Sequence, residues 1–414
     1  MRVIHMPDVE HIPAERATEV PRTRLRDLAI LFLRLGTTAF GGPAAHIAIL
    51  EDEIVRRRRW LTHDKFLDLL GAVNLIPGPN STEMAIYIGY LRAGWAGLLV
   101  GGVCFILPAM AMVTAIAWAY LRFGGLPQFT GLLAGVKPVV MAVILQALWG
   151  LSRRAVKTPF LAALAVAATV AAAWGVDPLT LLLLAGLVTG LERGLIRERG
   201  KHRKAMLVLL LAAASLMAVL YFPTRLASPE AVPFGLGPLL LYFLKIGAVL
   251  YGSGYVLLAF LEGDLVHRWH WLSSAQLLDA TAVGQVTPGP LFTTATFIGY
   301  LKAGLPGAVL ATVAIFLPSF VFIALSGPLI PRLRKSPIAG AFLDGVTVAS
   351  LALMAAAAWS LGRAALYPQP YSLRFGMTAV VLLLASAVLL LRFRVNPAWL
   401  VLGGACLGLI VYVL

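Results

Sequence analysis

Two stretches of the sequence place polar side chains directly after a pair of prolines in otherwise apolar surroundings. Residues 74–94 read NLIPGPNSTEMAIYIGYLRAG, and residues 284–304 read GQVTPGPLFTTATFIGYLKAG. In a bilayer, such a break frees backbone N–H and C=O groups, which protein or enclosed water must satisfy. The helix that restarts after the break points its positive N-terminal end toward the same place. The two stretches therefore predict an interior polar site suited to an anion.

The residues around the breaks form the candidate anion site. Asn80 with Glu83 fits a capping box, and Thr287 with Pro288 fits an N-cap and a first helical position. Two further breaks, FGGP and YGSG, each follow a cation by six residues, and two cations would balance a multiply charged anion. The candidate substrate-binding residues are Arg34, Lys245, Gly41, Gly42, Gly252, Gly254, Pro77, Gly78, Pro79, Asn80, Ser81, Thr82, Thr287, Pro288, Gly289, Pro290, Thr293 and Thr294. A single break would be interpreted as a kinked helix that packs on its neighbours, but the duplication favours a site.

Composition indicates the class of protein that must position these residues. The chain is 60% hydrophobic and 13% charged, and apolar runs such as 96–121 and 303–326 reach the roughly 20 residues that cross a bilayer. The net charge of +15 comes from basic residues beside apolar runs, as membrane orientation requires, without the aromatic pattern of nucleic-acid binding. We therefore predict an all-α polytopic integral membrane protein with the lipid bilayer as its partner and no nucleic acid. The cysteines and histidines show no metal-ligand spacing, and no cofactor is expected.

The sequence repeats itself at a nearly constant offset. A shift of 211 residues places Arg34 on Lys245 and the first PGP on the second, and a shift of 210 then places IGYLRAG on IGYLKAG. This pattern predicts two homologous halves. The expected organisation is a polar N-terminal tail over 1–24, a first repeat over 25–193, a basic loop and linker transmembrane helix over 194–235, and a second repeat over 236–414.

Loop charges predict that the second repeat is inverted. The basic runs 56–59 and 193–204 are typical of cytoplasmic loops. Five apolar runs separate Arg92 from Lys302, and an odd number of crossings places these two residues on opposite sides. We therefore expect inverted-topology repeats with helices broken at the FGGP, YGSG and PGP motifs, as many secondary transporters have. The broken segments are either hairpins that enter and return or pairs of discontinuous helices, and the sequence leaves both open.

Four acids are candidates for carrying a coupled proton, because a carboxyl group in a low-dielectric site can titrate near neutral pH. Glu83 and Asp344 have no acidic counterpart in the other half, and each is equally suited to be a capping group or a partner of Lys137. Asp68 and Asp279 correspond to each other, and they are alternative partners for the two cations of the anion site.

On these residues the sequence resembles the chromate ion transporter family in its long bidomain form, the chromate efflux permeases. The resemblance is carried by FGGPAAHIA at 40–48, LIPGPNSTEMAIYIGYLRAGWAG at 75–97, YGSGYVLLAFLEGDLV at 251–266 and VTPGPLFTTATFIGYLKAGLPGAVLATVAIFLP at 286–318. It implies export of chromate from the bacterial cytoplasm across the inner membrane, linked to the proton motive force, with sulfate as an isosteric substrate or competitor.

The expected function is therefore secondary active transport of a small inorganic oxyanion rather than an enzymatic reaction. The spans carry no His/Asp/Glu cluster that would support hydrolysis, and the sequence has no nucleotide-binding loop. Exporting a dianion from a cell that is negative inside is downhill by about 2.3 kcal/mol per charge per 100 mV, so a coupled proton is not strictly required. A sulfate or other oxyanion transporter, a passive anion channel and a membrane-embedded enzyme are the alternatives. A homodimer, common among inverted-repeat transporters, is left open.

Overall fold

The computed structural model describes residues 23–40, 42–193, 232–251, 254–326, 337–366, 373–393 and 395–413. Every regular element in these ranges is helical, and they contain no strand. Four helices are long and apolar enough to cross a membrane: Asn80–Phe123, Gln128–Ala155, Leu291–Leu325 and Pro337–Leu366. The predicted all-α polytopic membrane class is confirmed. Most of the expected tail and linker helix, together with Gly41 and Gly252, lies outside the described residues.

The first half begins with four short or bent helical elements. They are α1 (Leu25–Thr38), α2 (Gly42–Glu51) continuing into the π-helix η1 (Asp52–Arg57), α3 (His63–Val73) and α4 (Asn80–Phe123). α4 bends sharply at Ala93 and Gly94, where Gly94 has a φ of +63°, a conformation that glycine adopts without steric cost. Gly89 lies against Gly97 across the bend, so the two arms of α4 fold back on each other through small residues.

The second half follows the same plan. Its elements are α9 (Leu236–Val249), η3 (Gly254–Val256), α10 (Leu257–Phe260), the π-helix η4 (Leu261–Arg268), α11 (Ser274–Val286), η5 (Leu291–Thr293) and α12 (Thr294–Ser326). α12 bends at Ala303 and Gly304, and Gly299 lies against Gly307 across that bend. Ala303 has φ −146° and ψ 22°, against −145° and 21° at Ala93. The two bends thus have the same backbone geometry at an offset of 210 residues.

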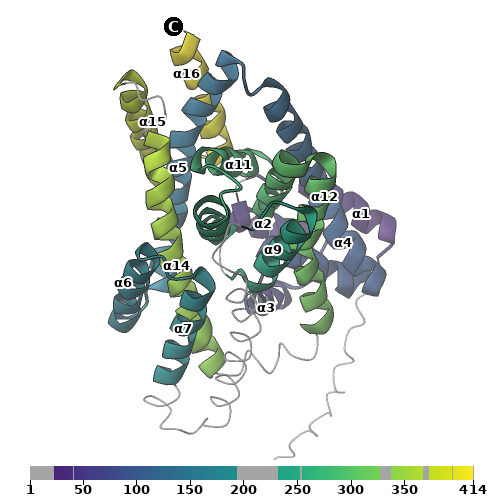
Figure 1. Cartoon of the computed structure of the whole chain (residues 1–414). Helices are drawn as coiled ribbons and strands as arrows, with labels where there is room; N and C mark the ends of the chain where they lie inside the picture. The colour runs from purple at the N-terminus through teal and green to yellow at the C-terminus, as the bar shows by residue number, and fades with distance from the viewer. Residues whose placement is uncertain are drawn as a thin grey trace, which may run out of the picture.

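The remaining helices form a second group. They are α5 (Pro127–Ala155), α6 (Pro159–Ala173) and α7 (Pro178–Leu191) from the first half, and α14 (Pro337–Leu366), α15 (Leu373–Arg392) and α16 (Pro397–Val413) from the second. α5 packs on α15 and α16, whereas α14 packs on α6 and α7, so each half covers the long helix of the other. Figure 1 shows α5, α14 and α15 standing together, apart from α1, α4, α9 and α12. Gly135 of α5 against Gly404 of α16, and Gly345 of α14 against Ala185 of α7, allow the close approach.

In each half, the segment that leads to the PGP motif begins next to the end of the helix arm that follows the motif. The backbone N–H of Thr23 donates to the Arg92 carbonyl at 3.0 Å, and the Arg92 guanidinium lies 4.8 Å from the centre of the Trp60 ring. In the second half, the Lys302 ammonium donates to the Trp271 carbonyl at 2.9 Å and lies 5.6 Å from the Phe234 ring. We name the groups the first mouth (Thr23, Trp60, Arg92) and the second mouth (Phe234, Trp271, Lys302). In each half, the chain thus returns at Arg92 or Lys302 to the place from which it starts, which fits both arrangements that the sequence left open.

Candidate anion site at the helix breaks

The breaks of the two halves meet at the centre of the molecule. The Gly78 N–H donates to the Leu250 carbonyl at 2.9 Å, and the Gly289 N–H donates to the Ala39 carbonyl at 3.0 Å. Each bond joins a PGP motif of one half to the first break of the other, and the two bonds correspond under the 211-residue offset. We name the described residues of the breaks (39–40, 74–79, 250–251 and 287–290) the junction. Its backbone bonds bring the two PGP motifs, residues 77–79 and 288–290, next to the first breaks of the opposite halves.

Glycine is required at both bonds. Gly78 has a φ of +141° and Gly289 a φ of +101°, a region that other residues rarely adopt. A Cβ on Gly78 would collide with the Glu83 carboxylate and lie 2.6 Å from the Ser319 hydroxyl. A Cβ on Gly289 would lie 2.7 Å from the Ala109 Cβ. The two prolines of the motif fix their own φ angles. The glycine between them has a positive φ and leaves no room for a Cβ, so other residues do not fit there.

Unpartnered polar atoms gather beside the junction. Glu83 is fully buried on the first turn of α4, and neither of its carboxylate oxygens has a hydrogen-bond partner. The hydroxyls of Thr82 and Ser319 are likewise buried without a partner. Leaving such a group unpaired costs about 1–3 kcal/mol, so the large majority of buried polar groups in native proteins are hydrogen-bonded. These groups therefore mark a place suited to a polar guest.

His46 belongs to the same site, and the sequence analysis missed it. Its ring is 2% exposed, with Nε2 at 3.0 Å from the Ala39 carbonyl and Nδ1 at 3.4 Å from the Ser81 hydroxyl. Nε2 donates to the carbonyl, which leaves Nδ1 to accept from Ser81. The Ala39 carbonyl thus receives both His46 and the Gly289 N–H. A search for metal-ligand spacing could not find His46, whereas its place three residues after FGGP is a usable signal.

The predicted helix caps are wrong at both PGP motifs. Pro79 occupies the N-cap position of α4, and the Asn80 side chain instead donates to Asn74 across the break at 2.6 Å. Thr287 ends α11 rather than starting a helix, and Pro290 precedes the next helical turn at η5. In both halves the restart follows the second proline, because that residue already has a helical φ and needs no N–H partner.

The threonines of the second half bond back to their own backbone. Thr287 donates to the Val283 carbonyl at 2.7 Å. Thr293 and Thr294 donate to the carbonyls of Pro290 and Leu291 at 2.8 and 2.9 Å. These hydroxyls keep their acceptor lone pairs but have used their single hydrogen. In this conformation, therefore, they do not offer a donor to an anion, in contrast to the unpartnered hydroxyls beside Glu83.

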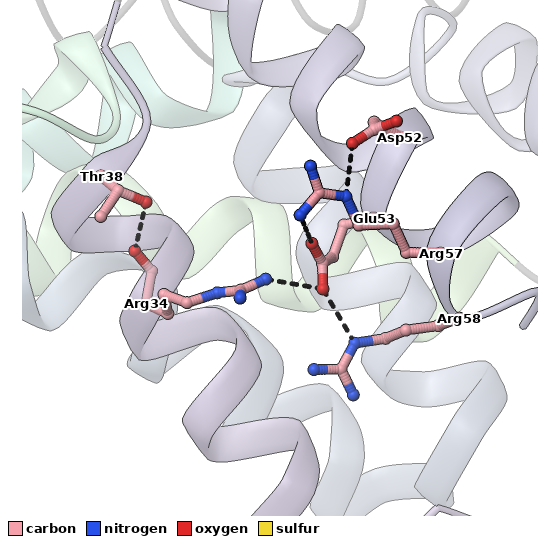
Figure 2. Close-up of polar contacts among 6 residues, drawn as sticks. All are labelled: Arg34, Thr38, Asp52, Glu53, Arg57 and Arg58. Carbon is pink, nitrogen blue, oxygen red and sulfur yellow. Dashed lines mark hydrogen bonds and ion pairs between the residues drawn. The ribbon is translucent and has the colours of Figure 1, made fainter.

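Arg34 lies in a charged cluster rather than at the junction itself. Its guanidinium is 2.6 Å from a Glu53 oxygen, and Figure 2 shows Arg57 and Arg58 reaching the same carboxylate. Arg57 also contacts Asp52 at 2.8 Å. The Glu53 side chain is only 9% exposed, so three guanidinium groups stabilise a nearly buried anion. We name these residues (Arg34, Asp52, Glu53, Arg57, Arg58) the Glu53 cluster.

The remaining candidate acids have local partners. Asp279 of α11 lies 3.3 Å from the Lys137 ammonium of α5 and accepts from the Tyr120 hydroxyl at 3.1 Å. Asp344 pairs with Lys157 at 2.8 Å, where both side chains are exposed. The partner of Lys137 is therefore Asp279, not Glu83 or Asp344. Asp68 is exposed on α3. Of the four candidate acids, Glu83 is the one beside the junction.

Comparison with known proteins finds chromate transporters that match nearly the whole chain. The profile of the chromate transporter family matches residues 26–191 and 237–409. The chain is 35% identical to the chromate transport protein of Cupriavidus metallidurans, over 95% of this chain and 94% of that protein. It is 32% identical to a probable chromate transport protein of Synechococcus elongatus, over 87% and 90%. A chromate transport protein of Pseudomonas aeruginosa is 33% identical, over 84% and 83%.

No solved structure matches the chain. The family profile nevertheless covers both halves, and each match contains one of the PGP motifs that form the junction. The relatives extend the likeness across the segment between the halves. This multi-pass membrane protein belongs to the chromate transporter family, whose members are transporters and not enzymes.

Proposed function

We propose that this protein exports chromate, CrO₄²⁻, from the bacterial cytoplasm across the inner membrane as a secondary active transporter linked to the proton motive force. The observation that carries the proposal is the junction, where reciprocal bonds of Gly78 and Gly289 hold four helix breaks beside unpartnered buried polar groups. Two relatives are named chromate transport proteins, which supports chromate as the anion.

The two halves act as inverted repeats. The second arm of α4 begins at the bend beside Arg92 of the first mouth, and its far end brings Tyr120 to Asp279 of α11 and to the Phe297 ring at 5.3 Å. α11 begins directly after the second mouth, so the two mouths lie toward opposite ends of this arm. The junction between them is where alternating access would open first to one side and then to the other.

The anion binds at the junction through backbone dipoles and hydroxyl groups. α4 restarts there at Asn80, and its positive N-terminal end with the unpartnered Thr82 hydroxyl offers donors to an oxyanion, whereas Ser81 becomes a donor only when it leaves His46. Chromate and sulfate are tetrahedral dianions of similar size, so sulfate competes for the same place. Arg34 and Lys245 attract the anion on its way through each hairpin rather than holding it at the centre. For a dianion, the membrane potential supplies about 4.6 kcal/mol per 100 mV.

Glu83 is the group that links the anion to a proton. An ionised carboxylate beside the junction would repel a dianion, so the bound anion favours the protonated form of Glu83. One proton would then leave with each dianion, so the membrane potential drives export by acting on the single net negative charge, while an acidic exterior opposes it. Burial, the absence of a fixed partner and the contact with Gly78 distinguish Glu83 from the other three acids.

The test is uptake of labelled chromate into everted membrane vesicles at fixed membrane potential, with and without a pH gradient and with excess sulfate. We expect saturable uptake that sulfate inhibits and that Arg34→Ala with Lys245→Ala abolishes. Glu83→Gln should abolish the acidification of the vesicle lumen that accompanies chromate uptake, whereas Asp344→Asn, which removes an exposed carboxylate with its own lysine, should leave it unchanged. Uptake equal to that of empty vesicles excludes chromate, and uptake that never saturates indicates a channel.

A further inference from the structure

A second polar cavity lies away from the junction, next to the second mouth. It has a volume of about 1200 Å³ and lies between α6, α7, η4 and α14. Its polar lining includes Asp177, Glu262, Asp264, His267 and Arg268. η4 carries four of these residues and leads within three residues from Arg268 to Trp271 of the second mouth. The cavity therefore gives polar access to the charged groups at this mouth.

Glu262 shows that the cavity is a constructed polar site. One of its oxygens accepts from Ser274 at 3.2 Å and from Ser360 at 2.6 Å, and it lies 3.3 Å from the His267 ring. Its other oxygen is buried without a partner, although the side chain is only 4% exposed. A nearly buried carboxylate with a free oxygen, held by two serines, shows that this cavity is lined by fixed polar groups rather than by apolar surface alone.

Asp264 is the titratable group of this site. It is 5% exposed, and burial raises its pKa to about 6, with Asp177 raising it further and Lys245 and Arg268 opposing the shift. The titratable and charged groups facing it are Lys245 and Tyr242 from α9, Asp177 before α7, and Glu262, His267 and Arg268 from its own element. α14 contributes the neutral Ser360.

The sequence offset relates Asp264 and Lys245 to the Glu53 cluster of the first half. Adding 211 to Arg34 gives Lys245, and adding 211 to Glu53 gives Asp264. Glu53 is fixed by three guanidinium groups, the closest at 2.6 Å. Asp264 instead faces one lysine and one arginine, with Asp177 nearby as a second acid. In the first half, Glu53 is thus held by three ion pairs. In the second half, the corresponding Asp264 is open to protonation from the cavity.

We propose that Asp264 binds a proton from the second-mouth cavity and that its protonation releases Lys245 to receive the transported anion. When Asp264 is ionised, it compensates the lysine charge and the mouth is unattractive to a dianion. When Asp264 is neutral, Lys245 faces the anion path with an uncompensated charge. Proton and anion therefore favour each other at this mouth. The inference rests on the proposed function, in which Lys245 attracts the anion, and on the basic run 56–59, which places the neighbouring first mouth in the cytoplasm and the second mouth outside.

The first test needs no substrate. Infrared difference spectroscopy of the purified full-length protein follows the carbonyl stretch of protonated carboxylic acids as the pH is changed. A band that titrates with a midpoint of about 6 is expected in the wild type and absent from Asp264→Asn. Asp344→Asn, which removes an exposed carboxylate outside the cavity, is the matched control and should keep the band. A band that survives in Asp264→Asn overturns the assignment of the proton to this residue.

The second test measures transport in everted vesicles while the pH of the lumen, which the second mouth faces, is varied at fixed potential. The initial rate of wild-type uptake, before protons accumulate in the lumen, is expected to rise as the luminal pH falls, by up to about tenfold per pH unit above 6, because the protonated fraction of Asp264 rises by that factor. Asp264→Asn should transport at all pH values without this dependence, and Asp264→Glu should restore a pH-dependent profile. An unchanged profile in Asp264→Asn overturns the release of Lys245.

The two tests separate this inference from the proposed function. If wild-type vesicles take up no chromate, the proposed function fails, and the infrared band still decides whether Asp264 binds the proton. If chromate is taken up and the band is lost in Asp264→Asn but the pH profile is unchanged, transport stands and the gating role fails. Loss of protein from the membrane in Asp264→Asn is checked against Asp264→Glu, which keeps the charge.

Discussion

The two mouths share a backbone plan and differ in electrostatics. Beside the first mouth, where the Arg58 guanidinium lies 5.1 Å from the centre of the Trp60 ring, Glu53 is nearly buried among three arginines that compensate its charge. At the second mouth, the corresponding Asp264 lines a cavity and faces a second acid, Asp177, as well as two cations. The comparison teaches that a duplicated hairpin can be specialised through side chains alone. Directionality in such a transporter would then depend on which mouth responds to protons, and not on a difference in fold.

The largest effect is expected at the junction, where the halves are most alike. Gly289→Ala combines a strained φ of +101° with a collision against the Ala109 Cβ, and it should lower the free energy of unfolding by about 2–6 kcal/mol. Thermal unfolding in detergent measures this. Gly94→Ala is the matched control, because its φ is also positive but no atom lies within 4 Å of the new Cβ.

The corresponding Gly78→Ala sharpens the comparison between the halves. The new Cβ meets the movable Glu83 side chain rather than a fixed methyl group. Gly78→Ala should therefore lower the free energy of unfolding less than Gly289→Ala does, and it should reduce transport more. Equal stability losses in the two variants would show that the strained backbone, and not the neighbouring side chain, decides the outcome.

A buried ion pair present in only one half gives the next largest effect. Lys137→Met leaves the Asp279 carboxylate, with a 4% exposed side chain, without its cation, and should destabilise the protein by about 3–5 kcal/mol. The double variant with Asp279→Leu should recover most of that loss, because both charges are then removed together. Asp68→Asn, at the exposed corresponding position, should cost less than about 1 kcal/mol. Chemical unfolding of the three variants measures the pattern, and a double variant no better than the single one would contradict it.

Substituting Asp264 and substituting Glu53 should change the free energy of unfolding in opposite directions. The raised pKa of Asp264 means that the folded state holds a proton more tightly than the unfolded chain does. Its favourable contribution is present below pH 3.8 and is lost as the pH rises through about 6. Asp264→Asn should therefore raise the thermal stability above pH 6, by up to about 3 kcal/mol. Glu53→Gln should lower it, because three guanidinium groups lose their anion. Shifts of the same sign would show that the mouths are not specialised in this way.

The fold class and the breaks could be predicted from the sequence, because long apolar runs, PGP motifs and a fixed offset are local signals. The partners of Glu53 and Asp279 could not, since they depend on helices brought together only in three dimensions. Arg34 pairs with Glu53, 19 positions away, and Lys137 with Asp279, 142 positions away. His46 was missed for the same reason, because its role depends on contacts with the Ala39 carbonyl and the Ser81 hydroxyl that form only in the folded structure. The helix caps failed because proline takes the N-cap position of the helical turn that restarts after each break.

The smallest effect is expected where the mouths differ by a conservative exchange. Arg92 donates to the Thr23 hydroxyl at 2.7 Å and lies over Trp60, whereas Lys302 bonds a carbonyl and lies near Phe234. A planar guanidinium stacks on an aromatic ring better than an ammonium does. Arg92→Lys should therefore cost about 0.5–1 kcal/mol, and Lys302→Arg should be nearly neutral. Thermal unfolding of both variants measures the difference. An equal loss of stability in Arg92→Lys and Lys302→Arg would mean that the positive charge alone, and not stacking on the ring, holds the two mouths together.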